Sequence, residues 1–96
     1  MIADDAKIPD DARPRLPRGV RLREDKVRDR WVLLAPERIV KVNPIAVEII
    51  KLCDGSRSLA EIVAGLAERF KADPERVGAD VRGLVASLAD KRMVEL

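Results

Sequence analysis

Residues 30–55, RWVLLAPERIVKVNPIAVEIIKLCDG, constrain the fold more than any other part of this 96-residue chain. Two apolar runs flank a turn that contains Pro36, which predicts two antiparallel strands. The second run leads straight into Asn43-Pro44, a strong helix start because Asn caps the first turn and Pro fits the first helical position. Gly55 is expected to end that helix in the left-handed conformation. This densely structured stretch contains no convincing catalytic group, so the chain is more suited to holding a partner than to reacting with one.

The strand patterns predict a three-stranded sheet. Residues 20–24 alternate apolar and basic side chains, as in a strand with one solvated face. Residues 31–34 are apolar on both faces, which is typical of a central strand. Residues 38–42 form the third strand, with Ile39 and Lys41 on one face and Val40 and Val42 on the other. The simplest arrangement is antiparallel, with the strand of Trp31 in the middle.

Two further helices follow, each with its own start signal. Ser58 and Glu61 have the spacing of a capping box, and Asp73-Pro74 opens the last helix. The fold class is therefore α+β, a three-stranded antiparallel sheet followed by three helices. Residues 1–18 are rich in Pro and charge and are expected to form a mobile or partner-dependent arm. Residues 19–96 are expected to form a single domain.

The composition removes several classes of function. The chain has no His, no Tyr and one Cys, so a Cys-His nucleophile pair and a Cys/His metal cluster are excluded. We expect no catalytic residue, no metal and no cofactor, and we expect Cys53 to be a small core residue. One Cys also suits a reducing cytosol. No apolar run is long enough to span a bilayer, and the acidic N-terminus does not resemble a secretion signal.

The basic residues are unevenly placed. Residues 13–30 contain eight basic and three acidic side chains. This block could attract an acidic partner or nucleic acid, or it could simply protect the edge of the first strand against aggregation.

An extended peptide could be captured at the other edge of the sheet. The third strand is mostly apolar, with only Lys41 protecting it, and such an edge can accept a peptide as a fourth strand. Small residues along one flank of the last helix, around Arg82, could form the floor of a groove, or they could mark close packing between helices. The candidate peptide-binding residues are Arg38, Ile39, Val40, Lys41, Val42, Gly78, Arg82, Val85, Ala86 and Ala89. Val40→Pro should abolish capture if the amide of Val40 faces the peptide, and Arg82→Glu should weaken binding if the groove takes an acidic side chain.

The same segments resemble the PqqD family of pyrroloquinoline quinone (PQQ) biosynthesis over about residues 20–88. The resemblance is carried by Arg30-Trp31, Leu33, Pro36-Glu37, Lys41, Asn43, Ala46, Ile49, Leu52-Cys53-Asp54-Gly55, Glu61-Ile62, Asp80-Val81 and Leu84. It implies a winged-helix-like peptide chaperone that binds the ribosomally made precursor PqqA and presents it to the radical S-adenosylmethionine enzyme PqqE. Related recognition elements take the peptide as an added strand, between the third strand and the third helix. Residues 91–94, KRMV, depart from the Gly-Leu ending that the family would predict.

Two other interpretations stay open. A DNA-binding winged helix is the main alternative, although Asp73, Glu75 and Asp80 make the last helix a poor match for phosphates. A homodimerisation module is compatible with the chaperone interpretation. We expect no nucleic acid and no membrane among the partners.

Overall fold

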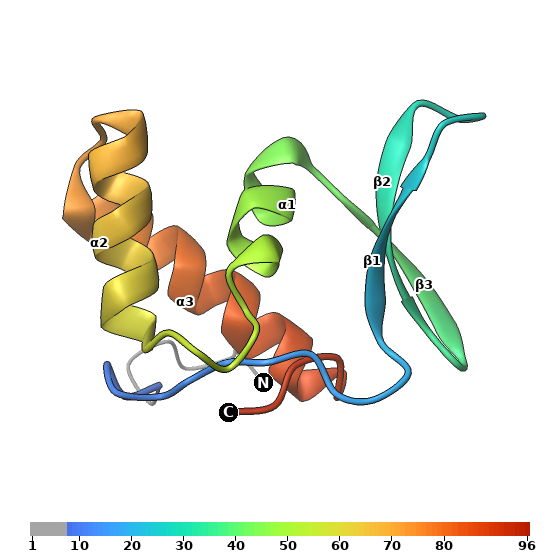
Figure 1. The fold of residues 1–96 in the computed structure, drawn as a ribbon, viewed down its shortest axis with the longest axis horizontal. Helices are drawn as coiled ribbons and strands as arrows, with labels where there is room; N and C mark the ends of the chain where they lie inside the picture. The colour runs from blue at the N-terminus through green and yellow to red at the C-terminus, as the bar shows by residue number, and fades with distance from the viewer. Residues whose placement is uncertain (1–7) are drawn as a thin grey trace.

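The computed structural model describes residues 8–96 and consists of a three-stranded antiparallel sheet followed by three helices, which confirms the predicted fold class. The sheet stands at one side of the molecule, with α1 between it and α2, while α3 runs beneath both helices (Figure 1). The elements are β1 (Arg21–Asp25), β2 (Arg30–Ala35), β3 (Arg38–Val42), α1 (Pro44–Lys51), α2 (Leu59–Phe70) and α3 (Pro74–Asp90).

The sheet has the strand order β1-β2-β3, so the two-faced strand is central, as predicted. Leu22, Leu33 and Val40 stand opposite one another across the three strands. Leu33 is completely buried, and Leu22 and Val40 pack against the core that the helices contribute. The opposite face carries Arg23 and Lys41, which are exposed. The helices therefore cover one face of the sheet, and on the other face the exposed Arg23 and Lys41 flank Val32, which is only 5% exposed.

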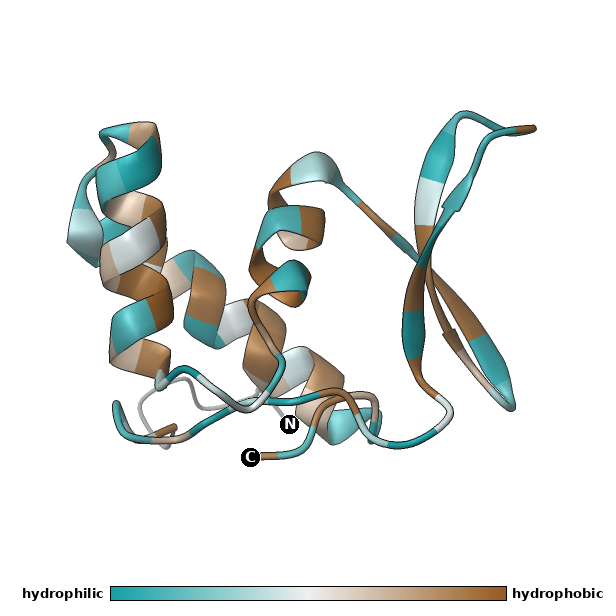
Figure 2. Ribbon diagram, viewed as in Figure 1, coloured by the Kyte–Doolittle hydropathy of each residue, from teal (hydrophilic) through white to brown (hydrophobic). Residues whose placement is uncertain are grey.

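The three predicted helix starts are all present. The side chain of Asn43 accepts a hydrogen bond from the N–H of Ala46 at 2.7 Å. Ser58 and Glu61 form the complete capping box, and Asp73 accepts from the N–H of Glu75 at 3.0 Å. These contacts satisfy N–H groups that have no partner inside their helices. Hydrophobic and hydrophilic residues alternate along each helix, as expected for helices that bury one face (Figure 2).

The end of α1 differs from the expectation. The helix stops at Lys51 and is capped by Leu52 in a right-handed conformation. Gly55 does have a positive φ of 83°, but it lies in the following loop. The N–H groups of Leu52 and Cys53 bond to the carbonyls of Ile49 and Ile50, so a tight right-handed turn ends the helix before the glycine.

Residues 8–18 differ from the expected mobile arm, because they pack against the domain. Ile8 and Pro14 are buried in its core. The N–H groups of Leu59 and Ala60, at the start of α2, donate to carbonyls in this segment, those of Ala12 at 2.7 Å and Asp10 at 3.0 Å. The folded unit therefore includes residues that the sequence analysis placed outside it. Residues 1–7 of the expected arm lie outside the described residues.

The C-terminal tail completes the core. Met93 and Val94 are buried at 1% and 3% exposure. They join the cluster that contains Leu59, Ile62 and Val81. Apolar side chains at these two positions thus serve packing in place of the Gly-Leu ending expected from the family.

Candidate functional site

The outer edge of β3 presents unpaired main-chain groups. The chain reverses at Pro36-Glu37, so Ala35 and Arg38 form the hydrogen-bonded pair that closes the hairpin. Hydrogen-bonded and non-hydrogen-bonded pairs alternate in an antiparallel ladder. The N–H and C=O groups of Ile39 and Lys41 therefore point away from β2, and no strand within residues 8–96 pairs with them. The amide of Val40 faces Leu33 instead, so it is not offered to a ligand.

The side chains of β3 divide between the two faces of the sheet. Val40 and Val42 are half-buried and pack against the helical core. Ile39 is 66% exposed on the solvent face. Arg38 and Lys41 are exposed as well. A strand added at this edge would therefore alternate its own side chains between the helices and the solvent.

A cavity of about 220 Å³ lies where β3 passes into α1. It is lined by Asn43, Ile45, Ala46 and Ile49, and by Asp80 and Leu84 of α3. Asn43 is held in place because its side chain caps α1, and the buried Ile49 forms part of the apolar wall. The cavity thus joins the end of β3 to α3, with one carboxylate among apolar side chains.

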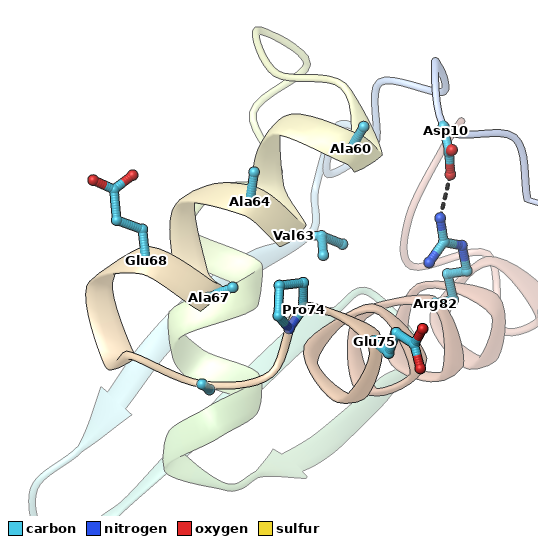
Figure 3. A pocket seen from close by; sticks show the side chains of 10 residues that line it. Asp10, Ala60, Val63, Ala64, Ala67, Glu68, Pro74, Glu75 and Arg82 are labelled. Atoms are coloured by element: carbon cyan, nitrogen blue, oxygen red, sulfur yellow. Dashed lines mark hydrogen bonds and ion pairs between the residues drawn. The ribbon is translucent and has the colours of Figure 1, made fainter.

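The predicted helix residues Gly78 and Arg82 lie on a different side of α3. Arg82 forms an ion pair with Asp10 of the N-terminal segment, across a hollow walled by α2 (Figure 3). A Cβ atom at position 78 would lie 2.8 Å from the Arg82 guanidinium and 3.7 Å from Val63 of α2. Gly78 therefore leaves room for the Arg82 guanidinium, and a side chain at this position would make only an ordinary van der Waals contact with α2. None of the residues that line the hollow belongs to β3.

The other predicted helix residues offer little surface. Val85 is completely buried, and Ala86 and Ala89 are half-buried, with Ala86 packed against the core. The structure thus brings Arg38, Ile39, Val40, Lys41 and Val42 together on β3, but it does not bring Gly78, Arg82 or Val85 to that edge.

The side of α3 that meets the β3–α1 junction is formed by Asp80 and Leu84, neither of which is among the predicted site residues. The spacing of Leu84 predicts a core residue, and the charge of Asp80 argues only against DNA binding, so sequence patterns alone do not assign either residue to the site. The available signal was their separation of four residues, which places a carboxylate and a leucine on one face of the helix.

The shifted pKa values of Cys53, Asp54 and Glu61 have local structural causes. Burial raises the pKa of the Cys53 thiol to about 12. Hydrogen bonds from Ser56 lower the pKa of Asp54, and the backbone N–H of Ser58 lowers that of Glu61. Across residues 8–96, no three His, Cys, Asp or Glu side chains are arranged to hold a metal ion. No helix in that same span is long and apolar enough to cross a membrane.

A comparison with known protein families shows to which family this chain is related. The family model of coenzyme PQQ synthesis protein D (PqqD) matches residues 30–94, which include β2, β3 and all three helices. The chain belongs to the PqqD family. The resemblance carried by its scattered motifs is thereby confirmed.

Relatives of this PqqD-family chain share its length as well as its sequence. It is 47% identical, over 95% of its length, to the PqqA binding protein of Rhodopseudomonas palustris (strain HaA2), and the match covers 89% of that protein. It is 49% identical to the PqqA binding protein of Xanthomonas axonopodis pv. citri (strain 306), over 90% of this chain and 94% of the relative.

Two solved structures share the fold of this PqqD-family chain. The solution structure of the PqqD truncation of Methylobacterium extorquens PqqCD matches with a TM-score of 0.81 and 42% identity, over 96% of this chain and 98% of the other. That protein is a stand-alone recognition element for ribosomally synthesized and post-translationally modified peptides. The crystal structure of PqqD from Xanthomonas campestris matches with a TM-score of 0.60 and 44% identity, over 94% and 100% of the two chains.

Proposed function

We propose that this chain is a non-catalytic carrier that captures the precursor peptide PqqA as a fourth strand along β3. The single observation that carries the proposal is that the backbone groups of Ile39 and Lys41 point outward from the strand that leads into the cavity at Asn43. Several relatives named PqqA binding protein, at 45–49% identity, support the choice of peptide. An exposed strand edge of this kind is a recurring way to bind an extended peptide.

Backbone pairing alone is too weak to account for capture. Four hydrogen bonds to Ile39 and Lys41 would contribute roughly 2–6 kcal/mol, at about 0.5–1.5 kcal/mol each. A micromolar complex needs about 8 kcal/mol after the cost of ordering the peptide has been met. Side chains of the peptide must therefore bind as well. The cavity lined by Asp80 and Leu84, where β3 passes into α1, is the site proposed for one of them.

The captured peptide would then be presented to the modifying enzyme PqqE. In this proposal the carrier supplies no catalytic group, and it orders the peptide in an extended form that an enzyme can read. The solvent face of the sheet, with Arg23 and Lys41, stays free when a strand is added at the edge. Two carriers that paired through their free β3 edges would form a homodimer. This homodimer would compete with the peptide for the same edge.

Amide chemical-shift mapping with synthetic PqqA peptide tests the proposal. We expect the largest shifts at Ile39 and Lys41, with further shifts at Asp80 and Leu84. Shifts confined to Asp10, Gly78 and Arg82 would instead place the peptide in the hollow between α2 and α3, and would contradict strand addition. Random duplex DNA should produce no comparable shifts, because α3 is capped by Asp73 and carries Glu75 in its first turn.

A further inference from the structure

A second and larger cavity lies beyond the end of the β3 edge. It has a volume of about 520 Å³ and lies between α1, the last turn of α2 and the first turns of α3. Its wall is mostly apolar and includes Ile45, Leu66, Phe70, Val77 and Val81. Ile45 is 63% exposed and Phe70 is 54% exposed, so two large apolar side chains stand at its mouth in contact with water.

An ion pair connects two helices at the rim of this three-helix groove. Arg69 of α2 forms an ion pair at 2.7 Å with Glu48 of α1. The same guanidinium lies 4.9 Å from the centre of the Phe70 ring. Arg69 therefore links α2 to α1 and restrains the aromatic ring, while Glu48 neutralises its charge. The mouth of the groove thus combines a restrained aromatic wall with a neutralised ion pair.

The three-helix groove is continuous with the cavity at the end of β3. Both cavities are lined by Ile45, Ile49 and Asp80. A chain that leaves the β3 edge near Asn43 can therefore pass from one cavity to the other along these shared residues. Asp80 lies at this boundary and can accept a hydrogen bond from a main-chain N–H at the point where strand pairing ends.

We propose that the three-helix groove binds a bulky apolar side chain of the peptide, one that lies beyond the segment paired with β3. This inference rests on the proposed function and adds a second contact to it. The volume falls in the range of sites that bury small ligands. Occupation would cover Ile45 and Phe70, and removal of apolar surface from water is the contribution that backbone pairing cannot supply.

The test uses PqqA peptide with Phe70→Ser, which alters the groove alone, with Ile45→Ser, which alters both cavities, and with the control Val27→Ser. Val27 is 91% exposed and lies in the turn between β1 and β2, away from the groove. We expect each groove variant to weaken binding about tenfold, which corresponds to the loss of a partly buried apolar contact. The Val27 variant should bind like the wild type. Replacing one bulky apolar peptide residue by Ala should weaken binding to the wild type, and much less to Phe70→Ser.

Intermolecular nuclear Overhauser effects on the wild-type protein give a second measurement that needs no variant. Contacts from the Ile45 methyl groups and the Phe70 ring to the peptide are expected. If Ile39 and Lys41 respond to the peptide but these contacts and the tenfold losses are absent, the groove inference is overturned and strand addition stands. If no β3 amide responds, the proposed function itself fails. Groove signals that change with protein concentration in the absence of peptide would identify a second copy as the occupant, which also overturns the inference.

Discussion

Arg15 and Glu95 exchange both of their backbone hydrogen bonds, at 2.9 and 2.8 Å, although eighty positions separate them in the chain. Their side chains also form an ion pair at 2.8 Å. The N-terminal segment and the C-terminal tail thus make a short two-residue bridge beneath the helices. Because carbonyl groups of the same segment accept hydrogen bonds from N–H groups at the start of α2, the segment is part of the folded unit.

Deleting residues 1–18 should therefore destabilise the domain. The deletion removes the carbonyl partners of Leu59, Ala60 and Gly55, both backbone hydrogen bonds between Arg15 and Glu95, and the buried Ile8 and Pro14. We expect a loss of roughly 3 kcal/mol or more from these five hydrogen bonds and one buried isoleucine. Urea denaturation of the deleted and full-length chains measures the difference. Equal midpoints would restore the expectation of a detached arm.

Lys41→Pro should abolish peptide capture, and Lys41→Ala should not. Proline removes the outward N–H and leaves the bonded amides of Val40 and Val42 in place, since Lys41 occupies a non-hydrogen-bonded position opposite Val32. The alanine variant keeps the N–H and loses only the exposed side chain. Isothermal titration with PqqA peptide compares the two, and circular dichroism checks the fold. Equal affinity in both variants would exclude this amide as a contact.

Arg82→Glu should lower stability, with recovery in the double variant Asp10→Arg/Arg82→Glu. The single change places a carboxylate beside Asp10 in place of their ion pair, and the double change restores opposite charges. The expected loss is about 1 kcal/mol, because Asp10 is exposed. Thermal denaturation of the wild type, the single variants Asp10→Arg and Arg82→Glu, and the double variant gives the coupling.

Peptide affinity of the same Arg82 proteins separates the two roles of this residue. If affinity falls in both the single and the double variant, then Arg82 contacts the peptide in the way that the sequence analysis suggested. If affinity is unchanged while stability follows the charge pairing, the residue serves the N-terminal segment.

The stability that Glu61 contributes should depend on pH. The N–H of Ser58 donates to its carboxylate and holds the pKa of Glu61 below its ordinary value of 4.5. A lowered pKa in the folded state stabilises the fold above about pH 4.5, and this contribution is lost as the pH falls through the folded-state value. Glu61→Gln should therefore lose less stability than the wild type on acidification. Glu68→Gln, an equal charge change at an exposed site on the same helix, is the control.

Cys53 should be unreactive in the native protein. Burial raises the pKa of its thiol from 9.0 to about 12, so the folded chain keeps this proton at pH values where the unfolded chain releases it. A disulfide reagent at about pH 8 should modify the thiol only after denaturation. Stability should fall as the pH rises above 9.0, and less steeply for Cys53→Ala. Rapid native modification would contradict this.

The local signals of the sequence were sufficient to predict every regular element, because each strand and helix start depends on nearby residues. Asn43, Ser58 and Asp73 cap their helices through contacts within three positions. The packing of residues 8–18 could not be predicted in this way. This segment is bonded to the backbone amides of Leu59 and Ala60. Because such bonds do not depend on side-chain type, no sequence pattern indicates them.

In the candidate site, too, one part could be predicted from local signals and another part depends on tertiary packing. The strand half follows from alternation and turn chemistry, and β3 has the predicted boundaries Arg38–Val42. The helix half depends on how α3 is rotated against the other elements. Helical spacing gives several flanks, and only tertiary packing decides that Asp80 and Leu84 face the β3–α1 junction while Arg82 faces Asp10.

The outward groups of Ile39 and Lys41 are peptide N–H and C=O, which every residue type except proline offers in equal measure to a partner. These main-chain groups therefore cannot distinguish one extended peptide from another. Discrimination among precursor peptides must reside in the hollows next to these groups. A domain built in this way can change the precursor it serves by altering a few cavity residues, while its ribbon of main-chain contacts stays the same.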